Sequence, residues 1–298
     1  MNITFRQLRL FIALADTGSV SAAARATHIT QPTASMQLRE VTASIGVPLY
    51  EVISRRVHLT QAGLDLAKTA RGIASDWALF EQTIDGMKGL TRGKLKVAVV
   101  STAQYFVPRL LGTFCARFPE IDISLEVLNR DGVVARLRDN LDDLYIMSMP
   151  PKDIDVEDHI FMPNPLVVIA ASAHALVKRR SIALSDLARQ RFILRERGSG
   201  TRMAVDAHFR KLKFKPNVRL EMGSNEAIKE AVAGGLGIAV ISSHALHGQA
   251  AEHGVSVLKV AGFPVHSNWH VVHLKGKLLS PIARVFHAHL TGQSTVRV

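Results

Sequence analysis

The chain has 298 residues, 47% of them hydrophobic, and a formal net charge of +12. This composition excludes a disordered chain, allows two or three domains with a sizeable core, and favours a protein that meets polyanions such as nucleic acid or phosphorylated ligands. The positive charge is not confined to one end of the chain. Residues 1–93 hold ten basic and seven acidic side chains, and residues 94–298 hold the remaining 27 basic and 18 acidic ones. No apolar run could span a membrane and no signal peptide is recognisable, so we expect a cytoplasmic protein with no membrane partner.

The first residues predict two short helices. Thr4 followed by Gln7 has the pattern of a capping box, and Gly18 is expected to end the helix that this box begins. Ser19 is expected to cap a second, alanine-rich helix, whose small side chains let another helix approach closely.

A third helix follows after a tight turn, which makes a helix-turn-helix, and in that motif the second helix of the pair reads the major groove of DNA. The helix begins near Pro32, and its cap is Thr30 or Gln31, because a residue before proline resists helical angles. Its leading turns carry neutral or apolar side chains suited to base edges, where a merely soluble helix would carry Glu and Lys. The expected DNA-reading residues are Gln31, Pro32, Thr33, Ser35 and Met36, with Arg39 on a phosphate.

Two short strands are expected next, at Leu49–Val52 and Val57–Leu59, around a turn that contains Arg55 and Arg56. As a wing beside the third helix, this hairpin would place both guanidinium groups against phosphates or in the minor groove. An ordinary solvated hairpin is the alternative.

A long helix capped by Thr60 is expected to run to about Gly89. Its apolar side chains recur at steps of three and four and form a seam that needs a partner. The partner is the rest of the chain or the same helix of a second subunit, and we favour the second because two reading helices match two half-sites of DNA. The expected dimer contacts are Ile73, Trp77, Phe80 and Ile84.

From residue 94 onward strands and helices alternate, which is typical of α/β architecture. We expect strands at 95–100, 123–128, 144–147, 165–171, 192–196, 218–222, 237–241 and 269–273, and helices near 106–118, near 133–140, after 198–202, at 224–235 and at 281–290. Two small α/β lobes with a cleft between them fit the number of elements. We expect a winged helix-turn-helix domain at 1–60, a linker helix at 61–90 and a two-lobed regulatory domain at 91–298. Lobe I comprises about 94–164 and 269–298, and lobe II about 165–268.

Three segments are expected to face the cleft, because ligands in such folds sit at strand ends and helix starts. The sharpest is "RERGSGTR" (195–202), where arginines accompany glycines at a helix start, the composition of an anion-binding site. Ordinary loop-to-helix junctions with capping residues are the alternative, above all for "VVSTAQ" (99–104) and "GSNEA" (223–227). The candidate effector-binding residues are Ser101, Thr102, Asn129, Arg195, Gly200, Thr201, Arg202 and Asn225.

Other chemistries have weak signals. "AGGLGIA" (233–239) follows a helix and does not match a dinucleotide fingerprint, and His270 and His273 face opposite sides of a strand, which argues against a metal site. The single Cys115 cannot form a disulfide within the chain and is expected to be buried. No Ser/His/Asp set, Walker loop or zinc motif appears, so we expect neither an enzyme nor a cofactor.

The segments "FIALADTGSVSAAARATHITQPTASMQLREVTASIGVPLYE" and "LTQAG" closely resemble LysR-type transcriptional regulators. Later segments, including "LDDLYIMSMPP", "RERGSGTRMAV" and "EMGSNEAIKEAVAGGLGIAVIS", resemble the CbbR subgroup, which controls genes for carbon dioxide fixation. The family implies a periplasmic-binding-protein-like (Rossmann-like) effector domain, a dimerising linker helix and usually a tetramer. The subgroup implies a phosphorylated or nucleotide-like co-inducer.

The chain departs from the family pattern on the DNA-reading surface. Met36 and Val52 stand where the family commonly has arginine, and Val41-Thr42 replaces a common Leu-Glu. Arg39, Arg55 and Arg56 are expected to compensate.

The sequence therefore predicts a regulator that binds a double-stranded operator and responds to a small anionic metabolite, as a homodimer or homotetramer, with RNA polymerase as a further candidate partner. A regulator of another metabolic operon with a non-phosphorylated carboxylate effector is the first alternative. An enzyme with a targeting module and a nonspecific architectural DNA binder are the others.

Overall fold

The computed structural model describes residues 2–53, 56–87, 93–246, 250 and 254–292, except for the side chains of residues 82, 83 and 85–87. The chain divides into two compact units, one built mainly from the first 81 residues and the other from most of the remainder. None of the helices in these ranges combines the length and the apolar character that crossing a membrane requires.

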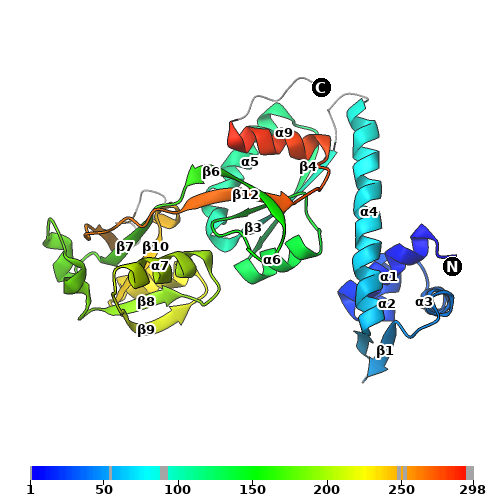
Figure 1. Cartoon of the computed structure of the whole chain (residues 1–298), viewed down its shortest axis with the longest axis horizontal. Coiled ribbons are helices and arrows are strands. Elements are labelled where there is room, and N and C mark those ends of the chain that lie inside the picture. The colour runs from blue at the N-terminus through cyan, green and yellow to red at the C-terminus, as the bar shows by residue number, and fades with distance from the viewer. Residues whose placement is uncertain (1, 54–55, 88–92, 247–249, 251–253, 293–298) are drawn as a thin grey trace. The chain divides into compact units, whose positions relative to one another are not determined.

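The first unit is a helix-turn-helix followed by a hairpin and a long helix (Figure 1). Its elements are α1 (Phe5–Thr17), α2 (Val20–Ala26), α3 (Gln31–Ile45), β1 (Tyr50–Ile53), β2 (Arg56–Leu59) and α4 (Gln61–Met87). The first three helices bury a small core that includes Leu10, Phe11, Leu14 and Leu38, and Leu49 from the loop before β1 joins it. Burial of these side chains fixes how α3 is presented.

The helix caps follow from the sequence. The capping box of Thr4 and Gln7 is present, and Gly18 ends α1 in a left-handed conformation with φ +61°. The Ser19 side chain accepts from the N–H of Ala22. Of the two alternatives at α3, Thr30 is the cap, since its side chain accepts from the N–H of Thr33.

The start of α4 is packed closely on the core. The Thr60 hydroxyl accepts from the N–H of Gly63 at 3.1 Å. A Cβ at Gly63 would lie 1.9 Å from the carbonyl oxygen of Leu49, so only glycine fits this approach. The expected hairpin is present with slightly different bounds, and the predicted end of the helix at Gly89 lies outside the described residues.

The second unit holds two five-stranded sheets, each with helices on both faces. Lobe I has the strand order β4-β3-β5-β12-β6, and α5 and α9 cover one of its faces while α6 covers the other. Its elements are β3 (Gly93–Val100), α5 (Val107–Arg117), β4 (Ile121–Leu128), α6 (Arg130–Arg138), β5 (Leu144–Met147), β6 (Val156–Pro163), β12 (Asn268–Leu274) and α9 (Pro281–Thr291).

Lobe II has the order β11-β7-β10-β8-β9, with α7 and α8 on opposite faces. Its elements are β7 (Leu166–Ala171), β8 (Arg191–Arg195), α7 (Gly200–Lys211), β9 (Asn217–Met222), α8 (Asn225–Ala233), β10 (Ile238–Ser242) and β11 (Val255–Leu258). In both sheets parallel pairs such as β3–β4 and β8–β9 occur beside antiparallel ones such as β12–β5 and β10–β7. The chain passes between the lobes twice, from β6 to β7 and from β11 to β12 (Figure 1).

Some expectations need correction. Strands β6 and β11 were not expected, since β6 is an edge strand with a largely exposed, polar first half and β11 has only four residues. Helix α6 starts at Arg130, three residues before its expected start, because Asn129 caps it through a hydrogen bond from the N–H of Gly132. Cys115 is half-buried rather than buried, on the side of α5 that is not fully covered.

Candidate DNA-reading surface and effector cavity

The leading end of α3 presents the side chains expected to read DNA. Gln31, Pro32, Met36 and Arg39 are exposed, while Ala34, Leu38 and Val41 on the opposite side of the helix are buried in the core. Thr33 and Ser35 are partly buried, and the Thr33 hydroxyl lies 2.8 Å from that of Thr30. The exposed side chains can therefore approach a groove without disturbing the fold.

The wing is only partly described. Arg56 begins β2 and is exposed, and Arg55 lies outside the described residues. Val52 is 62% exposed. An apolar side chain at this position offers no charge to a phosphate. Within the described part of the hairpin, the positive charge therefore comes from Arg56.

An exposed apolar stripe runs along α4. Ile73, Trp77, Phe80 and Ile84 are between 37% and 54% exposed, although side chains of this size are normally covered. The Trp77 ring contacts those of Phe5 and Phe80 at centroid distances of 5.9 and 5.6 Å, and its N–H donates to Glu81. Much of the surface of these four side chains is therefore left uncovered by the described part of the chain.

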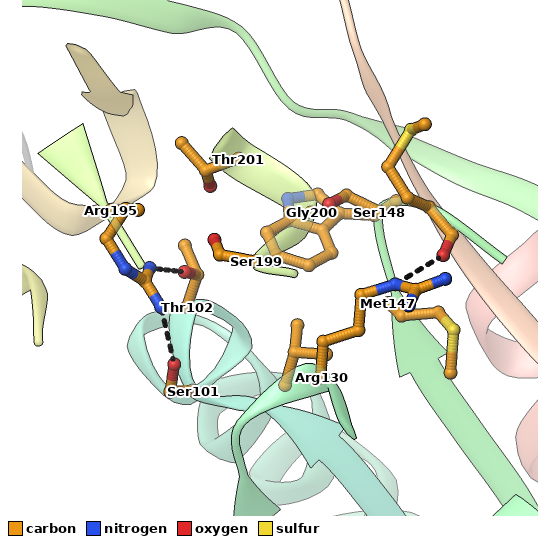
Figure 2. Close-up of a pocket in the computed structure, with 12 residues that line it drawn as sticks. Ser101, Thr102, Arg130, Met147, Ser148, Arg195, Ser199, Gly200 and Thr201 are labelled. Carbon is orange, nitrogen blue, oxygen red and sulfur yellow. Dashed lines mark hydrogen bonds between the residues drawn. The ribbon is translucent and has the colours of Figure 1, made fainter. Parts of the chain in front are cut away.

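A narrow cavity lies between the two lobes of the second unit (Figure 2). Its volume of about 10 Å³ holds about one water molecule. Lobe I contributes strand ends and helix starts, and lobe II contributes the end of β8 and the start of α7. The lining residues are Val100, Ser101, Thr102, Arg130, Met147, Ser148, Met149, Arg195, Ser199, Gly200, Thr201 and Trp269. The wall contains no carboxylate and two arginines, so it favours an anion.

Arg195 joins the lobes. It is 3% exposed and donates to Thr102 and Ser101 of lobe I, at 3.0 and 3.4 Å. It also donates to the amide oxygen of Asn225 and, through two N–H groups, to both oxygens of Glu196. These contacts use all of the N–H groups that a guanidinium has, so Arg195 holds the cavity together rather than offering a free donor.

The start of α7 closes one side of the cavity. The Ser199 side chain caps the helix, and Gly200 is so near lobe I that a Cβ there would lie 2.6 Å from the Ser148 hydroxyl. The first N–H groups of a helix lack intrahelical partners and carry partial positive charge. Gly200 and Thr201 therefore bring the positive end of the helix dipole into the wall.

The other arginines of "RERGSGTR" lie outside the cavity. Arg202 donates to both oxygens of Asp206 and, through another N–H, to Glu221 at 3.0 Å. The Arg197 side chain is 88% exposed.

Two asparagines among the candidates also lie outside the cavity wall. Asn225 donates to the hydroxyl of Thr102, which lines the cavity, and Asn129 caps α6. Asn225 therefore positions a lining residue, and Asn129 positions the helix that carries the lining residue Arg130.

Arg130 is a cavity residue that sequence reasoning missed. Its Nε donates to the carbonyl oxygen of Met149 at 3.1 Å, and the terminal nitrogens of its guanidinium group make no hydrogen bond within the described chain. The available signal was its place directly after β4 at the start of α6, the same strand-to-helix position that indicated Ser101 (Figure 2). Of the two arginines that line the cavity, Arg130 is therefore the one whose N–H groups can bind a ligand.

A second contact joins the lobes beside the cavity. The Tyr105 hydroxyl donates to Glu226 at the start of α8. Burial, followed by this hydrogen bond and the charge of Glu226, raises the pKa of Tyr105, so the phenol keeps its proton and remains a donor.

Histidines cluster away from the cavity, on lobe I. His287 lies 3.2 Å from His159 through ring nitrogens, and its ring centroid is 6.1 Å from that of His273. No group of three or more potential ligands in the described residues could hold a metal ion. Burial, together with the two neighbouring histidines, lowers the pKa of His287 to about 4, and Glu157 opposes this shift.

This shift predicts acid sensitivity of folding. Because the folded-state pKa of His287 lies below the ordinary value of 6.5, the unfolded chain binds more protons as the pH falls from 6.5 towards 4. The resulting stability is present above pH 6.5 and decreases by roughly 1–2 kcal/mol between pH 7 and pH 5. Urea titrations at pH 7 and pH 5 measure the free energy of unfolding at each pH. In His287→Gln, the decrease of this free energy between the two pH values should be smaller by about 1–2 kcal/mol. The same decrease in the unaltered protein and in His287→Gln would contradict the lowered pKa of His287.

The comparisons with known proteins agree with this arrangement. Residues 5–64 match the model of the bacterial regulatory helix-turn-helix protein, lysR family, and residues 88–294 match that of the LysR substrate binding domain. A winged helix-turn-helix with a separate two-lobed binding unit defines a ligand-responsive, DNA-binding transcription regulator and not an enzyme. The chain belongs to the LysR family of bacterial transcriptional regulators.

Curated relatives match over nearly the whole chain. The HTH-type transcriptional activator CmpR of Synechocystis is 44% identical over 97% of this chain and 95% of its own. The RuBisCO operon transcriptional regulator of Allochromatium vinosum is 39% identical over 99% and 97% of the two chains.

Two solved structures are informative in different ways. The Synechocystis CcmR regulatory domain in complex with 2-PG (2-phosphoglycolate) is 45% identical, with a TM-score of 0.65, over 68% of this chain and 98% of that one. Full-length CbnR complexed with its target DNA has a TM-score of 0.70 over 98% and 100% of the chains, and at 23% identity it shows the shared fold.

Proposed function

We propose that this protein controls genes for the fixation or concentration of carbon dioxide, in response to a small phosphorylated anion bound between its lobes. The names of the relatives and the 2-PG complex of CcmR support this proposal. The observation that carries it is the cavity wall, which includes both the start of α7 and Arg130 and contains no carboxylate.

In this proposal the N–H groups at Gly200 and Thr201 and the guanidinium of Arg130 hold the phosphate. The hydroxyls of Ser101, Thr102 and Ser148 supply neutral hydrogen bonds. Because the cavity volume is only about 10 Å³, entry of 2-PG requires the lobes or side chains to move. That movement couples ligand to conformation.

The lobe movement is proposed to change how subunits are arranged, and with them the spacing of the α3 helices on the operator. In this scheme residues 1–60 bind DNA, 61–90 pair subunits through the α4 stripe, and 91–298 bind the effector. A dimer or a tetramer, contact with RNA polymerase, and a place in the cytoplasm beside the operator belong to the proposal.

Calorimetry on the full chain tests the ligand class. We expect saturable binding of 2-PG, weaker binding of inorganic phosphate and no measurable binding of glycolate, because phosphate carries more charge to the α7 terminus than a carboxylate does. Glycolate binding as tightly as 2-PG would favour the carboxylate-responsive alternative.

Base reading by α3 has its own test. Gln31→Ala should weaken binding to the operator by about 1–3 kcal/mol and change binding to random DNA little, because an amide that pairs with a base edge contributes only at the correct base. The matched control is Arg39→Ala, expected to weaken both by a similar factor at fixed salt. Equal losses for Gln31→Ala on both DNAs, measured by gel mobility, would support the nonspecific architectural alternative instead.

A further inference from the structure

The cavity wall contains a buried hydrogen-bond donor, the indole N–H of Trp269. Trp269 lies on β12, is fully buried, and forms part of the lining. Its indole Nε1–H has no hydrogen-bond partner in the part of the chain that the structure describes. Native proteins rarely leave such a group unsatisfied, because burying it without a partner is unfavourable. The other tryptophan, Trp77, has a partner in Glu81.

The indole ring is held in place from both lobes. Its centroid is 4.9 Å from that of Phe106 in lobe I and 6.4 Å from that of His244 in lobe II. An indole nitrogen can donate a hydrogen bond and cannot accept one. The missing partner must therefore be an acceptor, such as an oxygen atom of a ligand.

The surrounding groups indicate which acceptor this is. The wall has no Asp or Glu, Arg195 has used all of its N–H groups, and Arg130 has terminal nitrogens free. Three sets of unused donors therefore belong to residues that line the cavity. They are the indole N–H of Trp269, the terminal nitrogens of Arg130 and the first N–H groups of α7. An anion with several oxygens satisfies them together, whereas a water molecule provides only two acceptor positions.

We propose that the Nε1–H of Trp269 donates a hydrogen bond to an oxygen of the bound anion, so that Trp269 is an effector-binding residue. This inference rests on the proposed function, since it adds a contact at the same site. It also explains why an indole occupies a position that an apolar ring of similar shape would fill without an unsatisfied group.

The two tryptophans make the contact observable in the full chain. With ¹⁵N-labelled tryptophan, the Trp77→Phe variant should show one indole N–H signal, from Trp269. Adding 2-PG should move this signal downfield and slow its exchange with solvent deuterium. A signal that stays in place while calorimetry shows 2-PG bound would overturn the proposal.

Removal of the donor gives a second readout. In the Trp77→Phe background, Trp269→Phe keeps an aromatic ring and should weaken 2-PG binding about tenfold or more relative to Trp77→Phe alone. Because phenylalanine is smaller, the decisive variant carries benzothienylalanine at 269 in the Trp77→Phe background, which keeps the shape and replaces N–H by sulfur. Binding of 2-PG as tight as in Trp77→Phe would overturn the proposal.

The two possible failures are distinct. If the unaltered protein binds neither 2-PG nor inorganic phosphate, the proposed function fails and this inference fails with it. If the protein binds 2-PG and the indole signal and the analogue show no effect, only the role of Trp269 is wrong.

Discussion

Replacing Gly63 with alanine is expected to unfold the winged helix-turn-helix unit and abolish operator binding. The new Cβ would lie 1.9 Å from the carbonyl oxygen and 3.0 Å from the carbonyl carbon of Leu49. This carbonyl cannot move away, because it accepts the N–H of Thr60 and its residue is fully buried. Backbone overlap of this kind should cost about 3 kcal/mol or more, a large part of the stability of a small unit.

The matched control lies on the same helix. Gly72 has nothing within 4 Å of the position of its Cβ, so Gly72→Ala should stabilise the unit by about 0.5–1 kcal/mol. Urea unfolding and gel mobility measure both variants. We expect Gly63→Ala to lose DNA binding while the separate second unit still binds 2-PG. Normal operator binding by Gly63→Ala would show that the packing at Leu49 is not as described.

The second large effect is expected at Arg130. Arg130→Gln should weaken 2-PG binding by about 100-fold, since a hydrogen bond to a charged group contributes roughly 1.5–3 kcal/mol and the cavity has no other arginine with free N–H groups. Operator binding in the absence of 2-PG should remain, because the substitution lies outside the DNA-reading unit. Calorimetry and gel mobility measure the two properties.

Arg197→Gln is the matched control, because it removes the same charge from the exposed loop before α7. It should leave 2-PG affinity within about twofold, since an exposed charge is screened by salt. If Arg197→Gln weakened binding as much as Arg130→Gln did, general electrostatic attraction rather than a specific contact would explain the site.

The position of Arg202 shows where sequence reasoning about the site reached its limit. The glycine-rich junction correctly indicated a helix start at the cavity, because caps and glycines are local signals. Which arginine faces a ligand depends instead on ion-pair partners. The ion pair of Arg202 with Asp206 could be predicted, because the two residues are one helical turn apart. The ion pair with Glu221 could not, because Glu221 lies on the separate strand β9.

The fold was predicted to a similar degree. The helices and central strands have strong periodicity and clear caps, and most of their bounds lie within a few residues of the expected ones. The edge strand β6 could not be predicted, because its pairing with β12 depends on a segment more than a hundred residues later in the chain. The unsatisfied donor of Trp269 is also a tertiary property, since only the packed cavity shows that it lacks a partner.

The central claim is that a small phosphorylated anion between the lobes changes how α3 reads DNA, and DNase protection of the promoter upstream of the protein's own gene tests it most directly. We predict a site protected at a salt concentration that leaves random DNA free, with a boundary that shifts by about one helical turn, ~10 bp, on addition of 2-PG. Arg130→Gln should protect the same site without the shift. A footprint that saturating 2-PG leaves unchanged in the unaltered protein would contradict the claim.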